Sequence, residues 1–524
     1  MMSINCIRAL LESAVETHSD KTALVFNEKS ISYGELYARV NQVAFYLNEL
    51  DLPKNTRIGI YSNKGIEQVV AVLAILSTDY ILVPLTKMLK PEQVEYIIND
   101  CDIKCIITDK LKLESIEEIN FDGHILSYET TAKEIASFEE IYKYYNKPYV
   151  CDINGHDNAI ITYSFGMTGT PKGIVISHRN LIDSARVVSQ YLNLEEDDVI
   201  SGLLIFNLDY GLNQIFCSLY KRATLALHRF ILPDDFFNHL INDKVTVLPL
   251  MPVNISQMFE DGMQRIPSPE LFDHLKTITS SGGNVTAKMI KDCKNTFRNA
   301  DFYSMHGLTE AFRSTYLDPS QVQIRPDSIG KAIPDVELYV INDEGKECGV
   351  REVGELIHRG GYIYRGFWNA PEQNALRFKS VDILKDVINL EGQLTDEIVV
   401  ATGDYVYKDE EGYLYFVSRH DNMIKTRGFR VSPYEVESVV AKNIPQIDQC
   451  AVFGLENEQI EEEIVMVYSA PSEISGEEII FELKKHLASY MIPGRIIYKR
   501  SLPLVQSDKN QVNKDALKRE LTAS

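Results

Sequence analysis

Apolar residues follow two spacings that alternate over the first 110 positions of the chain. Where they recur every three or four residues they predict amphipathic helices, and where they form short β-branched runs they predict buried strands. Helices are expected at 4–18, 33–47, 69–76 and 91–99, and strands at 57–61, 81–84 and 106–108. Strands that alternate with helices in this way predict parallel sheets with helices packed on their faces.

The pattern changes further along the chain. Residues 110–155 are charged, rich in tyrosine and less regular, which indicates a variable excursion. After residue 170 the alternation resumes, but residues 320–420 contain short strands separated by Gly and Asp turns. Beyond residue 428 helices and strands mix in an α+β manner, with a helix that begins at Pro433.

These patterns predict an α/β protein built from two domains. A large N-terminal domain, residues 1–419, would contain parallel-rich sheets flanked by helices and a small β subdomain at about 320–419. A small, mobile α+β domain, residues 421–524, would follow it. The 524 residues are sufficient for a large hydrophobic core.

Composition narrows the class of protein and its location. The formal net charge of −22 argues against a general binder of nucleic acid or of membrane surfaces. Eight cysteines occur without metal-ligand or C-x-x-C spacing, which fits a reducing compartment. The N-terminus lacks a signal-peptide layout, and the longest apolar run, Val69–Leu76, is too short to span a membrane. We expect a cytoplasmic protein with no nucleic-acid partner and no membrane insertion.

Residues 164–173 read Ser-Phe-Gly-Met-Thr-Gly-Thr-Pro-Lys-Gly and lie between two predicted strands. The backbone N–H groups of such a turn can form a nest for an anion, and glycine allows a ligand to approach closely. Hydroxyl groups and one cation add to this, from Ser164, Thr168, Thr170 and Lys172.

A P-loop is not the explanation for this segment. Pro171 stands where the P-loop has its second glycine, Gly173 stands where it has Ser or Thr, and a strand rather than a helix follows. Two interpretations remain for the isolated segment. It is either a phosphate-binding loop or a surface hairpin turn rich in small residues.

Three further clusters follow predicted strands. In the segment 306–310, Glu310 is a carboxylate suited to Mg²⁺, although the same residues could form the first turn of a helix. Paired glycines after Ser281 would let the backbone approach a flat ligand, or they form a simple loop between a strand and a helix. Asp404 stands at the predicted end of a strand, where it could accept from both hydroxyls of a ribose or form an Asx turn.

A basic segment at 418–430 stands out in this acidic chain. Four cations lie within twelve residues, at positions 419, 425, 427 and 430. A solvated turn is rarely so asymmetric, and we therefore favour anion binding at this segment.

Together these clusters resemble the motifs of the adenylate-forming enzymes, a superfamily of acyl-CoA synthetases, luciferases and nonribosomal-peptide adenylation domains. The resemblance covers nearly the whole chain, because the motifs keep their order and spacing. They stand at 164–173, 306–310, 354–356, 366–367, 371–372, 402–404 and 418–431. Within the superfamily, the chain is closer to stand-alone acyl-CoA ligases of bacterial surface-polymer and exosortase-type clusters than to multidomain synthetases.

The resemblance implies that ATP and Mg²⁺ are cofactors and assigns roles by position. The loop residues Ser164, Thr168, Gly169, Thr170 and Lys172 would hold the phosphates. The adenosine would contact Ser281, Gly282, Gly283, His306, Gly307 and Asp404, with Arg419 beside the ribose and Lys425 nearby. Glu310 would coordinate Mg²⁺, Thr309 would touch the α-phosphate, Asp421 would be the hinge between domains, and Gly428 would lie where a pantetheine arm enters.

The implied reaction has two steps. A carboxylate attacks the α-phosphorus of ATP, which gives an acyl-adenylate and pyrophosphate, and positive groups offset the charge that develops on the phosphates. The C-terminal domain then rotates about Asp421 so that a pantetheine thiol reaches the adenylate. The thiol would belong to another molecule, either CoA or a separate acyl or peptidyl carrier protein.

The chain departs from the family pattern at three places. His306 replaces a tyrosine, and Ser418 replaces a glycine. In the C-terminal lysine loop, alignment from Leu502-Pro503 makes Lys509 the catalytic lysine, whereas alignment backward from Ala516-Leu517 places Gln511 there. We choose Lys509 because a cation is the chemistry required, with Lys514 as the second candidate.

Only one segment of the sequence indicates which class of acid is activated. Asp209 and Phe216 keep the seven-residue spacing of amino-acid adenylation domains, whose aspartate pairs with the substrate ammonium. Asp209, Tyr210 and Gly307 are thus candidate substrate-binding residues, unless Asp209 only caps a helix that begins near Tyr210. Two other functions stay open: amino-acid adenylation with carrier loading and no CoA ligase activity, and a non-catalytic nucleotide- or acyl-binding homologue, which the altered lysine loop favours.

Overall fold

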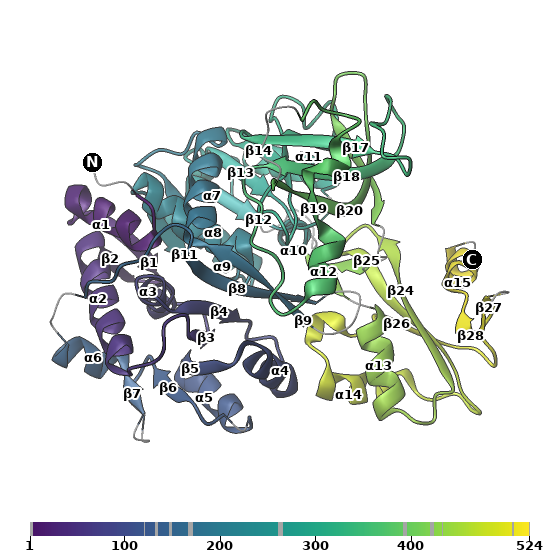
Figure 1. Ribbon diagram of the computed structural model, residues 1–524, viewed down its shortest axis with the longest axis horizontal. Coiled ribbons are helices and arrows are strands. Elements are labelled where there is room, and N and C mark those ends of the chain that lie inside the picture. Colours follow the sequence, from purple (N-terminus) through teal and green to yellow (C-terminus); the bar gives the residue numbers. More distant parts are fainter. Residues whose placement is uncertain are drawn as a thin grey trace.

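The structure is a computed structural model that describes residues 4–119, 121–131, 135–145, 149–165, 171–259, 266–283, 285–390, 396–419, 424–431, 433–505 and 508–522. It is a mixed α/β protein in which a large N-terminal part contains two extended sheets and a smaller C-terminal unit lies against one side (Figure 1). The predicted fold class is confirmed. None of the described helices is both long and apolar enough to cross a bilayer.

The first sheet has seven strands in the described part of the chain. Their order is β7 (Ala136–Ser137), β6 (His124–Ser127), β5 (Ile103–Thr108), β3 (Arg57–Tyr61), β4 (Ile81–Leu85), β8 (Asn158–Phe165) and β9 (Pro171–Ser177). All neighbouring pairs are parallel except β8 and β9, which form a hairpin with Ser164 opposite Lys172. The phosphate-loop segment thus connects two antiparallel strands at the edge of this sheet, as the two flanking apolar runs predict.

The segment 110–155 is more ordered than its composition suggests. It contains α5 (Lys110–Glu117) and α6 (Phe138–Tyr144), and β6 and β7 within it extend the first sheet. The expectation of an irregular excursion is therefore wrong for these elements. Their strands are only four and two residues long, which is too short for an alternating apolar pattern to stand out.

The second sheet runs through the rest of the N-terminal part and has fourteen strands among the described residues. Its parallel centre comprises β1 (Thr22–Phe26), β11 (Thr224–Leu227), β10 (Val199–Gly202), β12 (Val247–Leu250), β13 (Thr277–Ser280) and β14 (Asp301–His306), with β2 (Lys29–Ser32) at one edge. Antiparallel strands continue it: β15 (Thr315–Leu317), β16 (Ser328–Ala332), β21 (Leu414–Arg419), β20 (Ile398–Lys408), β18 (Gly354–Gly360) and β17 (Val336–Ile341), with β19 (Phe378–Ser380) beside β20. The predicted β subdomain is thus hydrogen-bonded to the parallel centre through β14 and β15.

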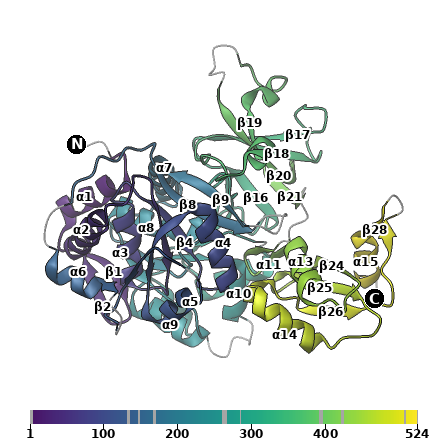
Figure 2. The same ribbon diagram turned by 60° about the horizontal axis from the view of Figure 1, so that its bottom comes forward.

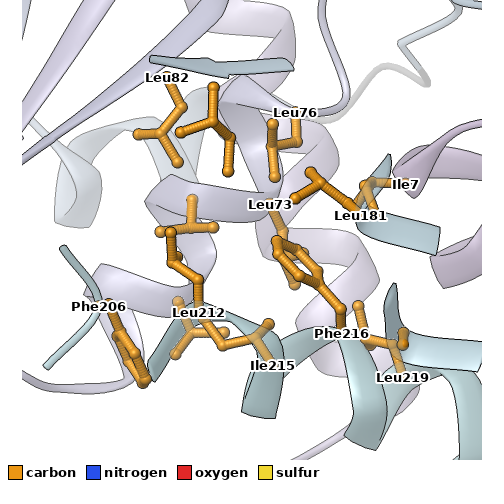
Figure 3. Close-up of a cluster of buried hydrophobic side chains, with 14 of the residues drawn as sticks. Ile7, Leu73, Leu76, Leu82, Leu181, Phe206, Leu212, Ile215, Phe216 and Leu219 are labelled. Carbon is orange, nitrogen blue, oxygen red and sulfur yellow. The ribbon is translucent and has the colours of Figure 1, made fainter. Parts of the chain in front are cut away.

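The main hydrophobic core brings together helices that connect both sheets. Besides α5 and α6, the α-helices described in the N-terminal part are α1 (Ile7–His18), α2 (Tyr33–Glu49), α3 (Ile66–Ile75), α4 (Pro91–Cys101), α7 (His178–Tyr191), α8 (Asp209–Lys221), α9 (Pro233–Asn242), α10 (Pro252–Phe259), α11 (Ala287–Thr296) and α12 (Pro371–Arg377). Figure 3 shows side chains of α1, α3, α7, α8 and β4 meeting in one cluster. Each buried Leu or Phe stabilises this core by about 1.5–3 kcal/mol. The core fixes the start of α8, where Asp209 and Tyr210 lie.

Local signals at helix ends behave as expected. Ser32 accepts from the backbone N–H of Glu35, whose carboxylate accepts from the Ser32 N–H, so the predicted capping box is present. Pro91 occupies the first turn of α4.

The C-terminal unit is a five-stranded sheet covered by helices (Figure 2). Its strands are β22 (Ile424–Thr426), β23 (Phe429–Val431), β24 (Gln449–Asn457), β25 (Glu461–Ser469) and β26 (Arg495–Tyr498), with a separate hairpin of β27 (Leu504–Val505) and β28 (Asp508–Val512). The helices are α13 (Pro433–Asn443), α14 (Gly476–His486) and α15 (Lys514–Thr522).

This unit docks on α4 of the large part. The Gln93 side-chain amide donates to Glu435 Oε1 at 3.3 Å, and His486 Nδ1 lies 3.5 Å from Glu92 Oε1. Met88 packs against the core of the C-terminal unit. Glu435 is buried at this contact, and the burial raises the pKa of its carboxyl to about 8, although the hydrogen bond from Gln93 opposes the shift.

Glu435→Gln should flatten the loss of stability between about pH 5 and pH 8. The folded protein keeps a proton on Glu435 that the unfolded chain has released above its ordinary pKa of 4.5, so wild-type stability falls until the pH passes about 8. The difference is on the order of a few kcal/mol. Thermal unfolding of both proteins across this pH range measures it, with Glu478→Gln as the control for an exposed carboxyl of α14. A difference between wild type and variant that does not change with pH would contradict this assignment.

Candidate active site

A cavity of about 200 Å³ lies where the two sheets and the C-terminal unit meet. It collects segments that are far apart in the sequence: the end of β8, the start of α8, the loops after β13 and β14, and the turn between β22 and β23. The carboxyl ends of the parallel neighbours β13 and β14 share one edge, which brings their loops together. The predicted site residues that line the cavity are Ser164, Asp209, Tyr210, Ser281, Gly282, Gly283, His306, Gly307, Thr309 and Lys425, together with Gly428.

Several predicted residues are not placed by this geometry. Thr168, Gly169, Thr170 and the hinge residue Asp421 lie outside the described residues. For Arg419 and Lys509 the structure describes the backbone, in β21 and β28, and not the side chains. Their roles stay predictions.

His306 and Asp404 join the two halves of the second sheet at the cavity wall. His306 Nε2 lies 3.0 Å from Asp404 Oδ2, and the Asp404 side chain is fully buried. The centroids of the His306 and Phe416 rings lie 6.2 Å apart. The Lys425 ammonium lies 4.1 Å from the Phe416 centroid. The imidazole and the cation, which both lie near Phe416, therefore line the cavity together with the loop at Ser281.

Asp404 is in the middle of β20 and not at the end of a strand, so that expectation is wrong. Gly403 has φ +70°, and the pairing of β18 with β20 shifts register close to it. The backbone N–H of Gly403 donates to Glu355 Oε1 at 2.8 Å. Gly403 interrupts the regular pattern of the strand just before Asp404, and the Asp404 side chain meets His306.

Glu310 lies just behind the cavity and is buried. Its Oε1 is 3.8 Å from Nε of Arg377, the last residue of α12, and its Oε2 has no hydrogen-bond partner among the described residues. Residues 307–310 form a bend after β14, so the alternative of a helix start at this segment is wrong. Arg377 was missed by sequence reasoning, although it follows the motif residues Pro371-Glu372 by only a few positions.

Lys172 lies on β9 next to the loop that the structure leaves undescribed. Its ammonium donates to Gln373 Oε1 of α12 at 2.8 Å. Burial lowers its pKa, while the nearby Glu372 acts in the opposite direction. The segment after β18 also braces β9, because Val175 N–H donates to the Gly366 carbonyl and Trp368 N–H to the Gly173 carbonyl, at 2.9 and 2.7 Å. The motif residues at 366–372 therefore hold the hairpin.

Asp209 and Tyr210 begin α8 at one side of the cavity. Asp209 Oδ1 accepts from the Tyr210 backbone N–H at 2.7 Å, so the carboxylate both supports the helix start and lines the cavity. The Tyr210 hydroxyl lies 2.6 Å from Thr279 Oγ1. Two further lining residues, Arg313 and Tyr364, were not singled out from the sequence. The only signal in the sequence is that Arg313 is a cation three residues after the motif residue Glu310.

This two-part α/β fold, with polar groups gathered at the strand ends beneath a small C-terminal unit, is the organisation of enzymes that bind an adenine nucleotide. The chain belongs to the AMP-binding enzyme family. The model of the AMP-binding enzyme matches residues 11–368, and that of the AMP-binding enzyme C-terminal domain matches residues 435–509. The resemblance found in the sequence motifs is confirmed at the level of the family.

Curated relatives are long synthetases. Tyrocidine synthase 1 of Brevibacillus parabrevis is 24% identical over 96% of this chain and 44% of its own length. Malpinin synthetase of Mortierella alpina is 26% identical over 96% of this chain and 6% of its own length. The chain therefore spans less than half the length of these relatives.

Solved structures share the fold over nearly their whole length. The o-succinylbenzoate CoA synthetase of Bacillus subtilis has a TM-score of 0.82 at 22% identity, with 97% of each chain covered. An amide bond synthetase of Marinactinospora thermotolerans has a TM-score of 0.84 at 18% identity, with 98% of this chain and 99% of that one covered. The narrower expectation of a stand-alone ligase from a surface-polymer or exosortase-type cluster stays a prediction.

Gly403→Ala should destabilise the protein by about 1–3 kcal/mol. Any Cβ at this position meets both an unfavourable positive φ and the Arg377 guanidinium. Gly345→Ala is the matched control, because Gly345 has φ +78° but no heavy atom within 4 Å of the added Cβ. Chemical denaturation of the three proteins measures the difference. Equal losses for the two variants would show that contact with Arg377 does not matter.

Proposed function

We propose that this chain activates a carboxylic acid with ATP, releases pyrophosphate, and passes the acyl group to a pantetheine thiol. The observation that carries the proposal is the single cavity that gathers Ser281–Gly283, His306, Thr309, Asp209 and Lys425 from four segments of the chain. A site for a nucleotide alone would not require the acid-side residues at the start of α8, and these adjoin the nucleotide-side loops.

The nucleotide would lie along the wall formed after β13 and β14. Gly282, with φ +88°, leaves room for a flat base, and His306 could stack on it. Asp404, held by His306, is the acceptor for the ribose hydroxyls, with Arg419 beside it. The phosphates would extend toward Lys172 and the loop containing Ser164, Thr168, Gly169 and Thr170, where the cation and hydroxyls bind oxygen anions.

The chemistry of Glu310 fits Mg²⁺. Its buried Oε2 has no hydrogen-bond partner in the described part of the chain, and a carboxylate oxygen is a ligand that hard cations prefer. No described group of three His, Cys, Asp or Glu side chains could hold a metal, so Glu310 would share the ion with ATP phosphates and water. When bound, Mg²⁺ would neutralise charge on the phosphates.

The first step is an in-line displacement at phosphorus. A carboxylate oxygen of the acid forms a bond to the α-phosphorus, the bond from that phosphorus to the bridging oxygen breaks, and pyrophosphate leaves with that oxygen. Thr309 would donate to the α-phosphate, and Lys509 would bridge the carboxylate and the phosphate. In Figures 1 and 2, β28 lies at the far end of the C-terminal unit, so this unit would rotate, with Asp421 as the hinge, to bring Lys509 to the cavity.

The second step is supported by a cavity of about 550 Å³ between the two parts of the molecule. It shares Met251, Phe429 and Tyr490 with the first cavity, and would admit a pantetheine arm to the adenylate. Cationic side chains line it at Lys87, Arg229 and Arg427, which suits the phosphate of the arm. Gly428 lies at the junction, where an added Cβ would be 2.7 Å from Met251 Sδ.

The proposal also covers the class of acid that is activated and the thiol that accepts the acyl group. Asp209 favours an amino acid whose ammonium it would pair with, and Tyr210 and Gly307 complete that end. A structural neighbour that is an artificially fused Adenylation-PCP di-domain of Klebsiella oxytoca supports a carrier protein as acceptor, and a neighbour named as a CoA synthetase supports CoA. We place the domain boundary at 419–421 and the protein in the cytoplasm, which suits its eight free cysteines.

The test is pyrophosphate release from ATP and Mg²⁺ with panels of amino acids and fatty acids, followed by thioester formation with CoA and with a carrier protein. Release that depends on one class of carboxylate is expected. If ATP binds and no carboxylate raises the release, the chain is a non-catalytic nucleotide-binding homologue.

Two variants should separate the steps. Lys509→Ala should lower pyrophosphate release by about 10²–10³-fold and spare transfer from a supplied acyl-adenylate, because the cation acts in the first step. Gly428→Leu should lower transfer from a supplied acyl-adenylate and spare pyrophosphate release. The reason is that the leucine side chain would fill the junction of the two cavities.

Lys514→Ala is the control for the choice of lysine, since Lys514 pairs with Glu437 at 2.7 Å within the C-terminal unit. An unchanged first step in Lys509→Ala would reject Lys509 as the catalytic lysine. A large first-step loss in Lys514→Ala would make that residue the better candidate.

A further inference from the structure

Arg313 is a buried cation that lines the cavity without a carboxylate partner. Arg313 is only 3% exposed, and no Asp or Glu oxygen of the described residues lies within ion-pair distance of its guanidinium. The guanidinium nitrogen Nη1 donates to the Phe312 carbonyl at 3.1 Å, and Nε is buried with no hydrogen-bond partner among the described residues. Arginine carries five N–H donors, so most of its capacity is unused.

Burying a guanidinium with so few hydrogen-bond acceptors costs free energy unless other groups compensate the charge. The guanidinium carbon lies 4.5 Å from the centroid of the Tyr210 ring and 4.6 Å from that of Phe312. These rings stabilise the cation in part, but a ring face does not satisfy N–H donors. The remaining donors are best matched by a carboxylate, which accepts two parallel hydrogen bonds from a guanidinium.

Arg313 lies on the acid side of the cavity. It contacts Tyr210, the neighbour of Asp209 at the start of α8. Arg313 and Asp209 both act on the buried phenol of Tyr364. The pKa of this phenol is raised mainly by burial, is raised further by Asp209, and is lowered by Arg313. Behind Arg313 lies a hollow of about 10 Å³, lined by residues of α7 and α8 such as Tyr191 and Asn213. The nucleotide-side residues Lys172 and Glu310 do not line that hollow.

We infer that Arg313 determines the substrate class: the activated acid carries a second carboxylate, which Arg313 binds at the closed end of the cavity. This inference rests on the proposed function, because it concerns the acid of the same site. The carboxylate to be activated points toward the ATP side, and the second carboxylate points toward α7 and α8. With Asp209 as the partner of an α-ammonium, the acidic amino acids satisfy all three groups.

The test compares acids that differ only in the charge at their far end. The pairs are glutamate with glutamine, aspartate with asparagine, and glutarate with its monoamide. For each pair, kcat/KM for pyrophosphate release and the thermal shift caused by the acid alone, without ATP, are measured on wild type, Arg313→Met and Arg313→Lys. Wild type should prefer a diacid over its amide by roughly 30-fold or more, which is the effect of one buried charge pair.

The variants separate a role in specificity from a role in packing. Arg313→Met keeps an unbranched apolar stem without the charge and should bring the diacid-to-amide ratio close to one, while Arg313→Lys should retain part of the preference. Arg8→Met is the matched control, because Arg8 is also a buried arginine near an aromatic ring, at 5.7 Å from the Tyr149 centroid, and does not line the cavity. It should leave the ratio unchanged.

Where wild type responds to acids, three outcomes would overturn the inference. They are an equal or greater preference of wild type for the amides, an unchanged ratio in Arg313→Met despite a lower melting temperature, and a loss of ATP affinity in Arg313→Met that does not depend on the acid. If no acid binds or promotes release in wild type, the inference is also rejected. If diacids shift the melting temperature through Arg313 but no pyrophosphate is released, the Arg313 site stands and the proposed adenylation fails.

Discussion

The contact between His306 and Asp404 is the constraint on which the site depends. A carboxylate removed from water must be compensated by close polar partners, and here the partner arrives from a different part of the sheet. His306 ends the last parallel strand, and Asp404 belongs to an antiparallel strand reached almost a hundred residues later. The contact therefore holds the parallel centre and the antiparallel extension in a fixed relation at the cavity. Arg377 and Glu310 form a second link of the same kind nearby.

Much of the fold was predictable because its helices and strands are long enough to show their periodicity. The strands at 57–61 and 336–341 begin and end where their apolar runs do, and Ser32 and Glu35 mark a helix start by a purely local interaction. The prediction failed where structure depends on distant partners. The short strand β6 is placed by its pairing with β5, and β7 by its pairing with β6, while Asp404 looked like a strand end because a bulge at Gly403 interrupts the pattern.

The candidate site was predictable to the extent that it uses residue types with few other roles. The glycines after Ser281 and the residues 306–309 do meet in one cavity, and Glu310 lies behind it. Arg313 and Arg377 could not be found in the same way, since an isolated arginine in a sequence is most often a surface residue. Only the folded chain shows that both are buried against acids or aromatic rings near the cavity. Residue type and spacing thus identify groups that contact a common ligand better than they identify groups that shape its pocket.

The hairpin of β8 and β9 has a consequence for the solubility of the protein. Hairpins that lead to a ligand loop have to lie near the surface, and an outer strand there exposes a row of unpaired N–H and C=O groups to other chains. In this protein residues 365–368 cover β9, with hydrogen bonds to the backbone of Gly173 and Val175. The edge is thereby closed by the chain itself, in addition to the proline and the lysine with which β9 begins. These hydrogen bonds use backbone groups alone, so the cover on β9 protects it against edge-to-edge aggregation whatever side chains stand at 366–368.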